Sequence, residues 1–94
     1  SMRKDKKILI ADDEPDILEI LQFNLEGDGY DVAIAKNGVE ALEKAKTFKP
    51  DLIILDVMMP NKNGIDTCKA LRTLPDFKNT IIVFLKKILK LGII

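Results

Sequence analysis

The sequence contains no histidine, no tryptophan and a single cysteine, and its 15 basic residues balance its 15 acidic residues. Without histidine, and with only Cys68, the chain by itself cannot form an ordinary zinc site, a histidine-ligated haem site or a histidine-based catalytic triad. Cys68 also cannot form an internal disulfide, which fits a reducing compartment. Any catalytic or metal chemistry is therefore expected to depend on carboxylates.

The chain also lacks an excess of charge of either sign and any long apolar run. A formal net charge of zero excludes a global basic field, so we expect no direct nucleic-acid partner. The longest apolar run, residues 81–85, is far shorter than the roughly 20 residues that span a bilayer, so no membrane partner is expected. No apolar core of a signal peptide follows the basic residues 3–7, and the chain is expected to be cytoplasmic.

The length and the pattern of apolar residues predict one small α/β domain. Ninety-four residues, 47% of them hydrophobic, are typical of a single globular domain. Short apolar runs alternate with amphipathic stretches, which predicts a parallel sheet with right-handed crossovers. The predicted strands are 7–11, 30–35, 51–55 and 80–85, and the predicted helices are 15–27, 39–48 and 65–73. Because residues 52–55 are all apolar, helices should cover both faces of the sheet.

Turn residues and apolar spacing define the limits of these elements. Pro15 fits the first turn of the first helix, and Asn37-Gly38 is interpreted as a turn before the second. Pro75-Asp76 should end the third helix. The apolar stripe expected on the first helix consists of Ile17, Ile20, Leu21, Phe23 and Leu25.

Two of the predicted strands end in acidic residues. The first is followed by Asp12-Asp13 and the third by Asp56, and ligands of parallel sheets bind at this edge. If the two strands are neighbours, three carboxylates converge, and their mutual repulsion requires a bound cation or a proton. Mg²⁺ suits a site of two or three carboxylates. Solvation or helix capping explains Glu14 and Asp16, but it explains Asp56 poorly because no helix starts there.

Three blocks of sequence resemble the receiver domain of two-component response regulators. The blocks are Ile-Leu-Ile-Ala-Asp-Asp-Glu-Pro at 8–15, Asp-Leu-Ile-Ile-Leu-Asp-Val-Met-Met-Pro at 51–60, and Asn-Gly at 63–64. Their order and spacing match over about residues 6–85. The resemblance implies a flavodoxin-like, doubly wound parallel sheet, here truncated after about the fourth strand.

The resemblance also implies roles for individual residues. Asp56 would be the phosphoacceptor, taking a phosphoryl group from a sensor histidine kinase or a phosphotransfer protein. Pro60 and Gly64 would shape the active-site loop beside it. The implied ligands of Mg²⁺ are Asp12, Asp13, Asp56 and the backbone carbonyl of Met58. One of Met58 and Met59 should pack inward, and Cys68 should have a half-buried packing role.

The chain departs from the family after the fourth strand. Receiver domains carry a Ser or Thr there and a Lys-Pro pair after a fifth strand, whereas here Lys86 follows Leu85. We therefore divide the chain into a tag remnant and lead-in (1–5), a receiver-like domain lacking its final strand and helices (6–85), and an atypical basic and apolar tail (86–94). A premature or frameshifted end of a longer reading frame is one hypothesis for this tail, and a natural short variant is the other.

Loss of a fifth strand would leave the fourth as an exposed apolar edge. Such edges recruit partners, so we expect a homodimer formed through this edge and the tail. In one interpretation Lys86 or Lys87 supplies the missing positive charge near Asp56; in the other the two form an exposed pair.

Three classes of function remain open from the sequence. The leading one is a phosphoacceptor signalling domain, which is not an enzyme and at most hydrolyses its own phosphoaspartate. A hydrolase with an aspartyl-phosphate intermediate usually carries a second Asp two residues after the nucleophile, where this chain has Met58. The third is a truncated, signalling-incompetent receiver that acts only as a self-associating interaction module.

Overall fold

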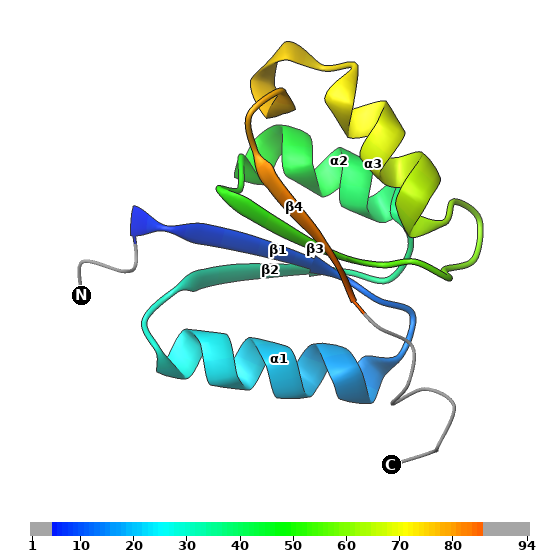
Figure 1. The fold of residues 1–94 in the computed structure, drawn as a ribbon. Coiled ribbons are helices and arrows are strands. Elements are labelled where there is room, and N and C mark those ends of the chain that lie inside the picture. Colours follow the sequence, from blue (N-terminus) through cyan, green and yellow to red (C-terminus); the bar gives the residue numbers. More distant parts are fainter. Residues whose placement is uncertain (1–4, 86–94) are drawn as a thin grey trace.

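A computed structural model describes residues 5–85 as alternating strands and helices (Figure 1). The predicted order is confirmed, and each boundary lies within two residues of its predicted position. The elements are β1 (Lys7–Ala11), α1 (Pro15–Gly27), β2 (Asp31–Ala35), α2 (Gly38–Phe48), β3 (Leu52–Asp56), α3 (Gly64–Arg72), the 3₁₀ turn η2 (Pro75–Phe77) and β4 (Ile81–Leu85). The predicted tail, residues 86–94, lies outside the described residues.

The four strands form one parallel sheet in the order β2-β1-β3-β4. The chain first winds outward from β1 to β2 and then crosses back to β3 and β4. This reversal places the carboxyl ends of β1 and β3 side by side. Helix α1 lies on one face of the sheet and helices α2 and α3 lie on the other (Figure 1). The predicted doubly wound α/β fold is therefore confirmed.

The two faces of the sheet bury separate apolar clusters. Side chains of β3 alternate between them, since Ile53 and Leu55 belong to the larger cluster while Leu52 and Ile54 pack against the smaller one. The larger cluster also contains Leu71 and a series of small residues from α2, β1 and β2. The expectation that β3 is covered on both faces is thus correct.

The predicted apolar stripe of α1 is wrong at two positions. Ile20 and Phe23 are 57% and 76% exposed. The helix instead buries Leu18, with Leu21 and Leu25 packed partly beside it. Residues three and seven positions apart lie on one side of a helix, whereas Ile20 and Phe23 fall on the opposite side.

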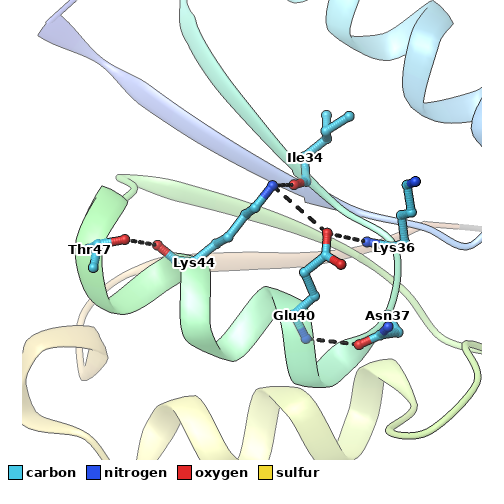
Figure 2. A network of polar contacts seen from close by, with 6 residues as sticks. All are labelled: Ile34, Lys36, Asn37, Glu40, Lys44 and Thr47. Atoms are coloured by element: carbon cyan, nitrogen blue, oxygen red, sulfur yellow. Dashed lines mark hydrogen bonds and ion pairs between the residues drawn. The ribbon is translucent and has the colours of Figure 1, made fainter.

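A network of polar contacts fixes the start of α2 (Figure 2). Asn37 is the N-cap, because its side-chain oxygen accepts a 2.8 Å hydrogen bond from the amide of Glu40. The Glu40 carboxylate in turn accepts from the amide of Lys36, 3.2 Å away. The interpretation of Asn37-Gly38 as a separate turn is corrected by this geometry, since Gly38 is already the first helical residue.

The carbonyl of Ile34 accepts a hydrogen bond from the ammonium group of Lys44, which also lies 3.8 Å from Glu40 (Figure 2). The carbonyl of the next residue, Ala35, accepts from Asp12 on the β1 side. Because carbonyls alternate along a strand, the Ile34 carbonyl points away from β1, toward the outer edge of β2. Lys44 therefore covers part of this edge of the sheet.

The opposite edge of the described sheet is β4, which is apolar and exposed. Ile81, Val83 and Phe84 have exposed fractions of 62%, 42% and 46%. Arg72 fixes the approach to this strand, because its guanidinium donates to the carbonyls of Phe77 and Thr80, both at 2.7 Å. Within residues 5–85 no helix is both long and apolar enough to cross a membrane.

Candidate functional site

Asp12 and Asp56 occupy equivalent positions at the carboxyl ends of two paired strands. Ala11 in β1 is in register with Leu55 in β3, so the residue that follows each of them reaches the same edge of the sheet. Both aspartate side chains are fully buried. The condition on which the sequence prediction depended, that these strands are neighbours, is met.

Asp12, Asp13 and Asp56 each bring a carboxylate oxygen to within 4.8 Å of the others. Asp13 is the exposed member and gives the cluster its contact with solvent. Two unit charges at this separation repel by roughly 3 kcal/mol at an effective dielectric constant of about 20. Three ionised carboxylates in this arrangement therefore favour a cation between them.

Hydrogen bonds to backbone amides orient the two buried carboxylates. Oδ1 of Asp12 accepts from the amide of Glu14 at 2.8 Å, just before α1 begins. Oδ1 of Asp56 accepts from the amide of Met58 at 3.2 Å, in the loop after β3. Each bond is local, so the strand end and the loop that follows it together determine where the carboxylate points.

The donor set fits Mg²⁺. Three carboxylate oxygens are hard ligands, and magnesium in proteins is bound through one or two carboxylates while it keeps several waters. Asp13 is exposed, so solvent reaches this side of the cluster. Bound there, the ion would neutralise the charge of the cluster. The ligand set predicted from the sequence contains these three residues and the backbone carbonyl of Met58, and it stays a prediction.

The loop after β3, residues 57–63, is closed by its own backbone. The amide of Gly64 donates to the carbonyl of Val57 at 2.8 Å, and the amide of Lys62 donates to Pro60 at 2.7 Å. Met59 is buried in the larger cluster, while the Met58 side chain is 68% exposed. The expectation that one methionine packs inward is thus confirmed. Pro60 is exposed at the turn of this loop.

Gly64 lies directly against the end of β3. A Cβ on Gly64 would overlap the carbonyl oxygen of Asp56 and lie 2.9 Å from its carbonyl carbon. A glycine is therefore required here by the close approach of two backbone segments. This close approach is a physical reason for the role predicted for Gly64, which is to shape the loop beside Asp56.

The sequence interpretation gave no role to Asn63, which the structure shows to be the N-cap of α3. Its side-chain oxygen accepts a 2.8 Å hydrogen bond from the amide of Asp66. The signal was present as an asparagine three residues before an acid at the start of a helix. Cys68 is half-buried against the larger cluster, as expected. Lys86 and Lys87 lie outside the described residues.

Curated proteins similar to this chain include transcriptional and DNA-binding regulators. Over 68 residues the chain is 60% identical to the alkaline phosphatase synthesis transcriptional regulatory protein PhoP of Bacillus subtilis (strain 168), covering 72% of this chain and 28% of that protein. Over 67 residues it is 43% identical to the DNA-binding response regulator MtrA of Mycolicibacterium smegmatis, covering 71% and 29%. The match therefore spans less than a third of the length of these relatives.

Solved receiver structures share the fold. The chemotaxis response regulator CheY4 of Vibrio cholerae is 38% identical with a TM-score of 0.82, over 84% of this chain and 66% of that one. The N-terminal domain of a response regulator receiver protein from Methanoculleus marisnigri is 34% identical with a TM-score of 0.81, over 85% and 65%. The family model described as the response regulator receiver domain matches residues 8–87. Fold, carboxylate cluster and sequence match agree: this chain belongs to the response regulator receiver domain family.

Proposed function

We propose that Asp56 accepts a phosphoryl group from the phosphohistidine of a sensor histidine kinase or phosphotransfer protein. A carboxylate oxygen of Asp56 forms the new P–O bond while the P–N bond of the phosphohistidine breaks. The imidazole leaves with the kinase, and the receiver keeps a phosphoaspartate. The proposal also places the chain in the cytoplasm, a compartment that fits the free thiol of Cys68.

The observation that carries this proposal is the close grouping of three carboxylates around the end of β3. Asp12 and Asp13 would hold Mg²⁺ together with Asp56 and the backbone carbonyl of Met58. Catalysis of phosphoryl transfer depends mainly on positioning the reacting groups and on stabilising the negative charge of the phosphoryl oxygens. Asp56 is well placed for this role because the sheet fixes its backbone and the Met58 amide orients its carboxylate.

The comparisons support a signalling domain. The relatives named PhoP and MtrA are transcriptional or DNA-binding regulators, and the match covers 28% and 29% of their lengths. We propose that this chain provides phosphorylation-dependent signalling and no direct contact with nucleic acid. The only enzymatic activity that we expect is hydrolysis of its own phosphoaspartate.

The direct test is the intact mass of the full chain after incubation with acetyl phosphate and Mg²⁺. We expect addition of one phosphoryl group to the wild type and none to the Asp56→Asn variant. The Asp13→Asn variant should react more slowly at limiting Mg²⁺, because it loses the exposed metal ligand. An unmodified wild-type mass, in a sample that NMR shows to be folded, would overturn the proposal.

Turnover of a phosphate monoester separates this proposal from a hydrolase. The second acid that such enzymes use two residues after the nucleophile is replaced here by Met58. We therefore expect a single phosphorylation and no multiple turnover of p-nitrophenyl phosphate. Sustained release of nitrophenol that disappears in the Asp56→Asn variant would favour the hydrolase instead.

The exposed edge of β4 favours a second property, association between two copies of the chain. Ile81, Val83 and Phe84 are exposed on a strand without a single charged residue. Lys44 partly covers the opposite edge of the sheet, at β2. We propose that β4 pairs with β4 of a second copy about a two-fold axis. A contribution of the tail to this dimer would involve residues outside those described.

Light scattering from micromolar to millimolar protein tests this second proposal. The wild type should approach a dimeric mass as concentration rises, and Val83→Lys should remain monomeric because it places a charge at the centre of the edge. Phe23→Lys, on the exposed side of α1, is the matched control and should still dimerise. A monomeric wild type over the whole range would refute self-association.

A further inference from the structure

Gly38, the first residue of α2, lies against the loop that follows the phosphoacceptor. A Cβ on Gly38 would overlap both the hydroxyl of Thr67 and the carbonyl oxygen of Lys62, and would lie 2.8 Å from Cβ of Lys62. Two of these three atoms belong to Lys62, and its carbonyl oxygen is backbone that no rotamer change can move aside. Gly38 itself is buried.

Thr67 and Lys62 connect this contact to the candidate site. The fully buried hydroxyl of Thr67 donates to the carbonyl of Asn63 at 2.7 Å. The amide of Lys62 donates to the carbonyl of Pro60 at 2.7 Å, within the loop that contains Met58. A movement of Lys62 would therefore act on the Pro60 carbonyl, in the middle of this loop.

The other side of the loop rests on the end of β3, where Gly64 meets Asp56 with no space for a side chain. Gly38 thus lets α2 approach the loop closely, and Gly64 lets the start of α3 approach the end of β3. The start of α2 is itself fixed by Asn37 and Glu40, as Figure 2 shows.

We infer that Gly38 is a positioning residue for the phosphoacceptor site, acting through the loop 57–63 and not by contact with the reacting atoms. Its missing side chain lets Lys62, and with it the loop that contains Met58, lie close against α2. The role of Gly38 in phosphorylation rests on the proposed function. Its contact with Lys62 is present without phosphorylation. The connection between β2 and α2 contributes no Mg²⁺ ligand, yet through Gly38 it would control the geometry of the phosphoacceptor site.

Gly38→Ala is the central test, because one methyl group forces Lys62 to move by roughly 1 Å and a misplacement of that size weakens a catalytic site strongly. We expect the dissociation constant for Mg²⁺ to rise by about tenfold, and phosphorylation by acetyl phosphate at saturating Mg²⁺ to slow by a similar factor. In the metal-free variant the amide signals of Met58, Lys62 and Gly64 should shift in NMR spectra.

Hydrogen exchange provides a readout that general destabilisation does not reproduce. The Gly64 amide is protected by the Val57 carbonyl, so in Gly38→Ala its exchange should accelerate more than that of amides in α1. Leu25→Ala, a change in the smaller cluster on the α1 face of the sheet, serves as the control for lost stability. It should lower the urea midpoint while leaving Mg²⁺ affinity within about twofold of the wild type.

Gly27→Ala is the matched glycine control, since a Cβ there meets no atom within 4 Å. It should retain wild-type Mg²⁺ affinity and wild-type loop signals. Asn37→Ala is the second test variant in case Gly38→Ala does not fold. It removes the cap that fixes Gly38 and should produce smaller shifts at Met58 and Lys62, with a rise of about twofold in the Mg²⁺ dissociation constant.

The inference fails if folded Gly38→Ala binds Mg²⁺ with wild-type affinity and leaves the Met58 and Lys62 signals unchanged. It also fails if Leu25→Ala weakens Mg²⁺ binding as much as Gly38→Ala does. Failure of the proposed function has a different signature, because the wild type would then not be phosphorylated while the effects of Gly38→Ala on loop signals and exchange would persist.

Discussion

The amide of Gly64 donates a 2.8 Å hydrogen bond to the carbonyl of Val57 and closes the loop that follows β3. This bond brings the start of α3 against the end of β3, so the backbone of Gly64 touches that of Asp56. The position of Asp56 therefore depends on the next helix as well as on its own strand.

Gly64→Ala should destabilise the protein and displace Asp56. The added methyl overlaps backbone atoms, and overpacking of this kind costs about 1–3 kcal/mol of unfolding free energy. Urea denaturation measures the loss, and phosphorylation by acetyl phosphate reports the displacement. Gly27→Ala is the control and should retain or slightly increase stability. Equal stability of Gly64→Ala and wild type would contradict the close approach.

Asp56→Asn should stabilise the metal-free protein, because it removes one of three neighbouring negative charges. We expect a gain of about 1–2 kcal/mol by urea denaturation at neutral pH. Mg²⁺ should stabilise the wild type by about 2.7 kcal/mol at a concentration of about 100 times its dissociation constant. The same Mg²⁺ concentration should stabilise the variant much less. An identical response of both proteins to Mg²⁺ would place the ion elsewhere.

Arg72→Ala should loosen the connection between α3 and β4. Its guanidinium donates to the carbonyls of Phe77, Lys78 and Thr80, with distances between 2.7 and 3.2 Å. Loss of these charge-assisted bonds should cost about 1.5–3 kcal/mol of stability. Lys69→Ala, an exposed change on the same helix, should be nearly neutral in the same thermal or urea measurement. Comparable losses in the two variants would show that the Arg72 contacts are not specific.

Lys44→Met should expose the edge of β2 at the carbonyl of Ile34. The variant keeps most of the side-chain length but removes the ammonium group that donates to this carbonyl. We expect a loss of about 0.5–1.5 kcal/mol and faster exchange of amides in β2. Lys46→Met, at an exposed ion pair with Glu43, should change stability by less than about 0.5 kcal/mol. No difference between these variants would mean that Lys44 does not protect the strand.

Local sequence was sufficient to predict most of the fold. The limits of β1 and α1 are marked by apolar runs, Pro15 and Gly27, whose backbone preferences act over a few residues. The site acids were also predictable, because parallel strands expose their carboxyl ends at one edge. The exposure of Ile20 and Phe23 was not predictable from composition, since it depends on which side of α1 meets the sheet.

The sequence by itself determined the alternation of strands and helices, the carboxylates at two strand ends and the family to which the chain belongs. Only the tertiary structure decided that Gly38 lies against Lys62 and Gly64 against Asp56, and that Arg72 fixes the approach to β4. The reason is physical. Propensity and patterning act between near neighbours along the chain, whereas the space left for a side chain is set by atoms that only folding brings together.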